Sequence, residues 1–232
     1  HAGYMYSGPC AAHFYAALDK TVESVILLGV NHWAEGAKVA LSPADHWETP
    51  LGPVRVDHVL ADWLKGNVPF LAEDSFAHLR EHSIEVQVPF LQRVLGDFSF
   101  LPISISHLSE YECSQLGEAL AHLHEEETSR GKKTVLIASS DLNHYLSPQE
   151  THRLDNLALD QVLQMNPRGL LRTVERAGIS MCGVIPAAVM LMAAQNLGAK
   201  RARLLKHCHS GDVAPMDEVV GYASVAVIDD LD

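Results

Sequence analysis

Five residues that could bind a metal ion or move protons stand beside apolar segments that read as β-strands. His32 follows "SVILLGVN", Asp141 and His144 follow "TVLIASS", Asp212 follows "RLLKHCHSG", and His1 opens "HAGY", which resembles a strand end entering a turn. Ligand-binding groups in open α/β sheets collect where strands end and loops begin. We therefore expect these side chains, distant in the sequence, to meet at one edge of a sheet.

Two imidazoles and one carboxylate form the expected ligand set. His1, His32 and Asp212 match the facial triad that holds Fe(II) and leaves positions open for substrate and oxygen. Zn²⁺ could use the same three ligands, with water as its remaining ligand. His144 would stay uncoordinated, and an unperturbed pKa of about 6.5 suits it to proton transfer near neutral pH. Asp141, in the same loop, is expected to orient His144.

The residues next to these candidates allow two interpretations. Glu81 and His82 in "EHSIE" stand at an expected helix start, where a carboxylate complements the helix dipole. The same two side chains could instead support the metal ligands from behind, and the sequence leaves both interpretations open. Trp33, directly after His32, is expected to line the pocket, and Asn31 lies at the same strand end.

Cysteine usage indicates a reduced, cytoplasmic protein rather than a disulfide scaffold. Cys10, Cys113, Cys182 and Cys208 are scattered and form no CxxC pair. Cys182 precedes a helix start, but no base lies near it in the sequence, so we expect a buried structural cysteine there. Cys208 is expected to pack in the core.

The charge of the chain restricts its partners. The sequence has 17 Lys and Arg against 29 Asp and Glu, a formal charge of −12. Such a chain is a poor partner for nucleic acid or for an anionic membrane face. No window approaches the roughly 18 apolar residues that a membrane-spanning helix needs. The sequence gives no indication of an oligomeric state.

Apolar, β-branched runs alternate with helical segments along the chain. We expect strands at 24–30, 98–106, 133–140, 201–208 and 221–228, and helices at 9–20, 55–66, 81–95, 108–127, 150–165 and 183–197. This alternation predicts a three-layer α/β/α sandwich around a mostly parallel or mixed central sheet. We expect one domain over residues 1–232, and the start at "HAGY" suggests that a natural N-terminal segment with a further strand is missing.

Six ordered motifs carry a resemblance to a known family. They are "HAGYMYSGPCAAHFY", "ILLGVNH", "ETPLGPVRVD", "EHSIEVQVPFLQ", "SSDLNHY" and "SGDVAPMDEVVGYASVAV". In this order they resemble the motifs of the Memo-like family, whose bacterial and archaeal members are labelled AmmeMemoRadiSam system protein B. That family is in turn similar to the class III extradiol dioxygenases, which cleave catechol rings with a non-haem Fe(II).

The resemblance implies roles for particular residues. His1 and His32 match the two histidine ligands, and His144 matches the acid–base histidine of the dioxygenases. The third ligand position falls on Asp212, where the dioxygenases have glutamate and animal family members have cysteine. We expect Fe²⁺ as the metal, with Zn²⁺ or copper as alternatives. Copper would be favoured if the amine of His1 were free to chelate it beside the imidazole.

Three functions remain open at this stage. The first is a dioxygenase or other oxidoreductase acting on a small chelating, catechol-like substrate. The second is a metal-dependent hydrolase in which His144 activates a metal-bound water. The third is a non-catalytic adaptor that binds a metal or a phosphopeptide, but no arginine stands inside a strand-end motif to receive a phosphate.

Overall fold

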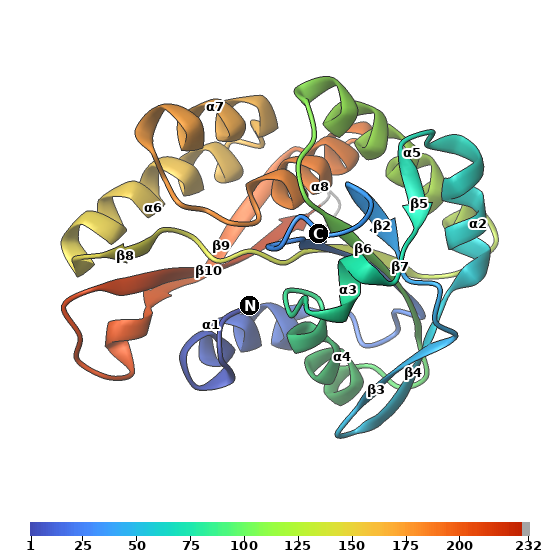
Figure 1. Ribbon diagram of the computed structural model, residues 1–232, viewed down its shortest axis with the longest axis horizontal. Helices are drawn as coiled ribbons and strands as arrows, with labels where there is room; N and C mark the ends of the chain where they lie inside the picture. The colour runs from blue at the N-terminus through green and yellow to red at the C-terminus, as the bar shows by residue number, and fades with distance from the viewer. Residues whose placement is uncertain (229–232) are drawn as a thin grey trace.

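The computed structural model describes residues 1–228 of this chain, in which helices and strands alternate (Figure 1). The helices are α1 (Tyr4–Ala17), α2 (His58–Asn67), α3 (Phe76–Leu79), α4 (Val88–Val94), α5 (Glu110–Ser129), α6 (Pro148–Leu163), α7 (Pro167–Ala177) and α8 (Val184–Asn196), with short 3₁₀ turns η1 (Glu85–Gln87) and η2 (Ser210–Asp212). The strands are β1 (Ser24–Val30), β2 (Val39–Leu41), β3 (His46–Thr49), β4 (Gly52–Val56), β5 (Leu71–Glu73), β6 (Ser99–Ile105), β7 (Thr134–Ala138), β8 (His144–Leu146), β9 (Arg201–His209) and β10 (Val219–Ile228).

A mixed, mostly parallel sheet forms the centre of the molecule. Its main strand order is β3-β4-β6-β1-β7, with β2 and β5 joined beside β6. Strand β1 pairs in parallel with β6 on one side and with β7 on the other. Every residue of β1 and β6 is buried, as expected for strands that are covered on both faces. The predicted α/β fold class is confirmed.

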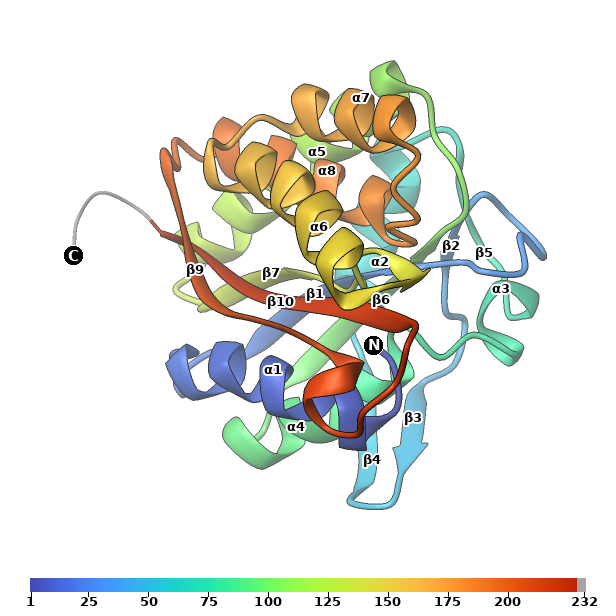
Figure 2. The same cartoon turned by 90° about the vertical axis from the view of Figure 1, so that its left-hand side faces the viewer.

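Two helical layers cover this sheet (Figure 2). On one face, Ile26 and Leu28 of β1 pack with residues from α2, α5 and α8. On the other face, Val25 and Leu27 pack with residues from α1 and α4. Successive side chains of a strand point to opposite faces, so an unbroken apolar run supplies both core layers at once. This is why β1 shows no alternation of apolar and polar residues.

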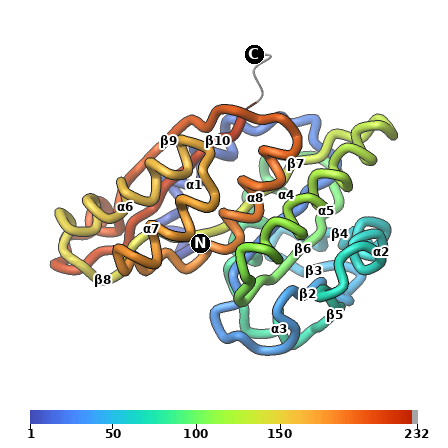
Figure 3. The backbone as a smooth tube through the Cα atoms, turned by 90° about the horizontal axis from the view of Figure 1, so that it is seen from above, coloured from blue at the N-terminus to red at the C-terminus, as the bar shows by residue number. Residues whose placement is uncertain are grey.

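A second, smaller sheet extends the molecule beyond β7. Its strand order is β8-β10-β9, and β9 and β10 form a long antiparallel ribbon. Seen from above, α6 and α7 lie over this ribbon (Figure 3). A third apolar cluster joins them, with Leu154 and Leu159 of α6 packed against Val225 and Val227 of β10.

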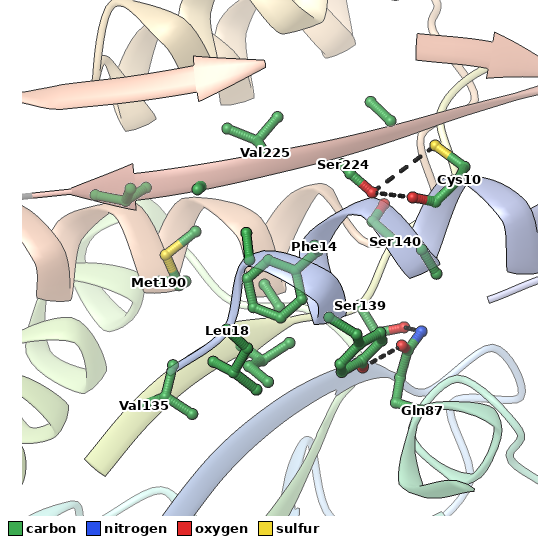
Figure 4. A pocket seen from close by; sticks show the side chains of 18 of the residues that line it. Cys10, Phe14, Leu18, Gln87, Val135, Ser139, Ser140, Met190, Ser224 and Val225 are labelled. Atoms are coloured by element: carbon green, nitrogen blue, oxygen red, sulfur yellow. Dashed lines mark hydrogen bonds between the residues drawn. The ribbon is translucent and has the colours of Figure 1, made fainter. Parts of the chain in front are cut away.

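An apolar slot separates the two sheets. Residues 135–138 of β7, the following Ser139 and Ser140, and residues 222–228 of β10 form its walls, and α1 covers it (Figure 4). Its cavity volume is about 290 Å³. His1 lies near the end of the slot at which β7 ends, since its Nδ1 is 3.1 Å from Ser139 Oγ.

Most predicted elements are present, and one needs correction. The helix expected over 81–95 is a turn followed by η1 and then α4, with Pro89 in the first helical turn of α4. The carboxylate of Glu81 accepts hydrogen bonds from the backbone of His82 and Ser83, which turns the chain before it becomes helical. Helix α7 was not predicted, although Asn166 caps it and Gly178 ends it in the left-handed conformation (φ 62°).

The expectation about membranes is also addressed by the structure. Within residues 1–228, we find no helix that combines the length and the apolar character needed to cross a bilayer.

Candidate metal centre

Five of the predicted site residues, His1, His32, His82, Asp141 and His144, meet in one open cavity at the carboxyl ends of β1 and β7. The cavity has a volume of about 530 Å³. The side chains that line it come from widely separated parts of the sequence: His1, Ala2, His32, His82, Asp141, His144, Tyr145, Ser180, Cys182 and Val220. The strand-end rule therefore located the cavity for His32, Asp141 and His144, and His1 joins them from the segment before α1.

His1 is held at the bottom of this cavity. His1 is 6% exposed, and its Nδ1 lies 3.1 Å from Ser139 Oγ. The same Oγ also accepts a hydrogen bond from Gln87. The main-chain nitrogen of His1 donates to Asp141 Oδ1 over 2.6 Å. With Nδ1–H directed at Ser139, the lone pair of Nε2 is directed toward Cys182, whose sulfur lies 3.2 Å away.

Glu81 fixes the second imidazole. The carboxylate lies 2.9 Å from His32 Nδ1 and accepts a hydrogen bond of 2.7 Å from the His32 backbone. Burial disfavours the charged carboxylate, but hydrogen bonds from His32 and Ser83 outweigh it and lower the pKa of Glu81 to about 2. A carboxylate behind an imidazole in this way fixes its tautomer and leaves Nε2 for a metal ion. Glu81 therefore contacts His32 directly, in the position that the second of the two sequence interpretations gave it.

Gly29 allows Glu81 to reach this position. A Cβ atom at Gly29 would lie 2.4 Å from the side chain of Ile84 and 2.6 Å from Ser83 Oγ. The segment that carries Glu81 therefore packs directly on the backbone of β1, and Ser83 donates to the carbonyl of Val30 over 2.8 Å. A side chain at position 29 would push this segment away from His32.

Cys182 is the third group of the cluster, and it was predicted to be only structural. Burial disfavours its thiolate, but hydrogen bonds from His144 and His32 outweigh this and lower the pKa of Cys182 to about 6. Reciprocally, hydrogen bonding to Cys182, followed by that to Glu81, raises the pKa of His32 to about 9. Gly183 lets Cys182 approach the strand end, since a Cβ there would lie 2.6 Å from the carbonyl oxygen of Ser139.

Three groupings of potential ligands share this cavity. In each grouping, one ligand atom per residue lies within 4.8 Å of the others: His1 with His32 and Cys182, His32 with Glu81 and His82, and Asp141 with His144 and Cys182. The first grouping offers two imidazole nitrogens and one thiolate of lowered pKa. This donor set fits zinc, copper and iron, since imidazole and thiolate suit all three.

His144 faces the cluster with one nitrogen free of backbone contacts. Its Nδ1 lies 2.8 Å from the carbonyl oxygen of Ser180 and therefore donates to it, while Nε2 is 4.0 Å from Asp141 Oδ2. Burial alone would lower the pKa of His144, but hydrogen bonding to Cys182 and the charges of Cys182 and Asp141 raise it. This geometry places a proton acceptor beside the candidate ligands, as the sequence predicted.

Asp212 is not brought to His1 and His32. It lies in η2, beyond the end of β9, and its side chain is 53% exposed. Oδ2 accepts a hydrogen bond of 3.0 Å from the backbone of His209, so the carboxylate closes the turn that it belongs to. The expected third-ligand position is corrected accordingly: within the described residues, the cavity contains Cys182 where Asp212 was expected.

Of the other residues predicted to lie near the site, His82, Trp33 and Asn31, only His82 lines the cavity. His82 lines it and stacks on His32, with ring centroids 4.9 Å apart. Trp33 is 52% exposed and lies outside the lining, with the Arg80 guanidinium 4.1 Å from its ring centroid. Asn31 is buried, and its amide donates to the carbonyl of Glu35, so it shapes the loop after β1.

Sequence reasoning missed Cys182 because it follows no strand. It lies between α7 and α8, at the start of a helix that packs under β1 and β7. The available signal was "CGVIP", a thiol followed by a small residue and a helix start, where the local field favours a thiolate. Only the packing of that helix start against Ser139 and Ser140 brings the sulfur to the histidines.

Fold and site together define an α/β protein whose open pocket, at the ends of parallel strands, collects possible metal ligands. The chain belongs to the Memo-like protein family, whose family model matches residues 1–226. It is 41% identical to a MEMO1 family protein of Pyrobaculum aerophilum over 228 residues, which cover 97% of this chain and 80% of that protein. It is 42% identical to a MEMO1 family protein of Methanosarcina acetivorans, covering 98% of this chain and 83% of the relative.

The fold is also similar to that of a solved structure. An uncharacterized protein from Escherichia coli K12 superposes with a TM-score of 0.57 and 14% sequence identity, over 89% of this chain and 88% of that one. At this identity the similarity supports the α/β fold and carries no information about function.

Proposed function

We propose that His1, His32 and Cys182 bind one metal ion, and that the protein is an oxidoreductase acting on a small chelating substrate in the adjoining cavity. The observation that carries this proposal is the meeting of two imidazole nitrogens and a thiolate of lowered pKa within 4.8 Å of one another. Fe²⁺ is our first choice of metal, with copper and Zn²⁺ as alternatives that the same donors would accept.

The chain's own residues supply binding, orientation and proton transfer. A bound Fe²⁺ would contribute a Lewis-acidic centre that exchanges electrons with oxygen and binds a vicinal diol. His144 Nε2 is positioned to take a proton from a substrate hydroxyl group, because its Nδ1–H is already directed at Ser180. Asp141 would stabilise the resulting imidazolium from 4.0 Å. His82 and Tyr145 form the rim against which a flat ring can pack.

The adaptor alternative finds less support in the cavity. A phosphopeptide site needs guanidinium groups that face the ligand. None of the described residues lining this cavity is an arginine. Outside the cavity, Arg80 pairs with Glu35 and Arg153 pairs with Glu150. A hydrolase would use the same His144 as a base and is separated from an oxidoreductase by experiment.

The test is anaerobic loading with Fe²⁺, followed by oxygen-uptake measurements on a panel of catechols. We expect Cys182→Ala to bind much less iron than the wild type, and Asp212→Asn to bind as much. Equal iron in wild type and Cys182→Ala would refute the ligand set. Stoichiometric iron in the wild type without oxygen uptake, but with hydrolysis of an ester panel, would replace the oxidoreductase by the hydrolase.

A further inference from the structure

A pair of thiols, Cys10 and Cys208, lies between α1 and β9, outside the metal centre. Cys10 on α1 is 2% exposed, and its Sγ lies 3.8 Å from the carbonyl oxygen of Lys206 and 3.9 Å from Ser224 Oγ. The main-chain oxygen of Cys10 also accepts a hydrogen bond from Ser224 (Figure 4). The sulfur of Cys10 is thus fixed against the face of the β9–β10 ribbon.

Cys208 points at the same face of that ribbon. Side chains alternate along a strand, so Lys206 and Cys208 of β9 face α1, while His207 faces α6 and lies 3.0 Å from Asp155. Cys208 stands opposite Tyr222 in the ladder, next to the pair formed by Lys206 and Ser224. Cys208 and Cys10 therefore lie on the same side of the ribbon, in the layer between β9 and α1, close enough for each thiol to affect the pKa of the other. Cys208 is partly exposed, so solvent reaches one member of the pair.

The pKa values of the two thiols are shifted in opposite directions. The hydrogen bond from Cys208 lowers the pKa of Cys10 to about 7, although burial opposes this, and Ser224, His207 and Lys206 add to the lowering. The proton held between the sulfurs raises the pKa of Cys208. A thiolate next to a thiol is the arrangement that reacts with oxidants and then forms a disulfide.

We propose that Cys10 and Cys208 form a reversible disulfide when the protein meets a hydroperoxide, which joins α1 to β9. One sulfur, as the thiolate, attacks the peroxide oxygen; the O–O bond breaks, an alcohol or water leaves, and a sulfenic acid remains. The sulfur of the second cysteine then attacks the sulfenic sulfur, the S–S bond forms, and water leaves. In total, two thiols lose two electrons and two protons, and the hydroperoxide is reduced.

The disulfide would connect the two ends of the chain. Helix α1 begins directly after His1, and β9 belongs to the C-terminal ribbon. A cross-link between residues so distant in the sequence restricts the unfolded chain strongly. We expect the oxidised protein to melt on the order of 5 to 10 °C above the reduced protein.

The experiment treats the reduced protein with hydrogen peroxide, blocks the remaining thiols with iodoacetamide, and maps peptides without reduction. We expect a peptide pair joining Cys10 to Cys208, a mass loss of two hydrogens at these sites, and a rise in Tm. Dithiothreitol should reverse all three. Peptide mapping separates this reaction from oxidation of Cys182 in the metal centre.

Matched variants complete the test. Cys208→Ser, which changes the more exposed thiol, should abolish both the linked peptide and the rise in Tm, and Cys10→Ser should do the same. Cys113→Ser, which changes a buried cysteine on α5, should retain both. The proposal is overturned if the wild-type peptides of Cys10 and Cys208 remain separately alkylated after peroxide treatment, or if Cys208→Ser still shows the rise in Tm.

Discussion

The sulfur of Cys182 lies 3.2 Å from Nε2 of His1, although 181 positions separate the two residues in the chain. This contact joins the loop before α8 to the residue that precedes α1, and His32 approaches both from the end of β1. In the ligand set that we propose, this thiol stands in place of the carboxylate that we expected as the third donor. The proposed set is softer than the one that the sequence predicted, and it suits a wider range of metals.

Glu81→Gln should weaken metal binding by about 10- to 100-fold, as is usual when the carboxylate behind a ligating histidine is removed. The amide keeps the shape of the side chain but loses the charge that holds His32 Nδ1–H and orients the ring. The measurement is a competition titration with a chromophoric chelator. Glu118→Gln, on an exposed position of α5, is the matched control and should bind like the wild type. An unchanged affinity in Glu81→Gln would mean that His32 needs no partner.

His144→Gln should retain the metal but lose turnover by about 10²- to 10⁴-fold, the usual contribution of a general acid–base. His144 belongs to no grouping with His1 and His32. It is grouped with Cys182, but the amide of glutamine can still donate a hydrogen bond to that sulfur, so we expect all three proposed ligands to stay in place. Metal content and oxygen uptake are measured on the same sample. His122→Gln removes an exposed histidine of α5 and should leave both unchanged. Loss of metal together with activity would make His144 a ligand instead.

Gly29→Ala should destabilise the fold by roughly 1 to 3 kcal/mol, the usual cost of overpacking a core. The new methyl group would lie 2.4 Å from Ile84, so the segment around Glu81 must move away from β1. We therefore expect lower metal affinity as well as a lower urea midpoint. Gly66→Ala in α2 meets no atom within 4 Å and should be neutral or slightly stabilising. A normal urea midpoint for Gly29→Ala would contradict the packing described above.

We expect the titration of His78 to lower the stability of the folded protein as the pH falls. Burial lowers the pKa of His78 from 6.5 to about 4, so in this window the unfolded state binds a proton that the folded state does not. Its contribution to stability is complete above pH 6.5 and is lost as the pH falls towards 4, at most about 3 kcal/mol.

The measurement for His78 compares urea unfolding of the wild type and His78→Phe across this pH window. The phenyl ring keeps contact with Trp47, whose ring centroid lies 5.5 Å from that of His78, but it cannot titrate. The difference in stability between the two proteins should therefore change with pH. A constant difference would mean that another group causes the acid sensitivity.

Hydrophobic patterning was sufficient to predict the fold class. The apolar runs of β1 and β6 are buried from end to end, and the predicted 24–30 strand has the bounds of β1. The secondary structure of such a run can be predicted from the run itself, because consecutive apolar side chains indicate an element that is covered on both faces. The 81–95 segment differs, since the carboxylate of Glu81 directs its first residues into a turn that no periodicity indicates.

The sequence by itself predicted that His1, His32, Asp141 and His144 would meet, because the last three follow strands whose ends a parallel sheet aligns at one edge, and "HAGY" resembles such a strand end. Only the tertiary structure decided the third donor. Asp212 turns back on the backbone of His209, and the packing of α8 against the ends of β1 and β7 brings in Cys182. The hydrogen bond between Asp212 and His209 spans only three residues. The position of the Cys182 sulfur relative to His1 and His32 depends instead on how whole helices and strands pack, which no short stretch of sequence predicts.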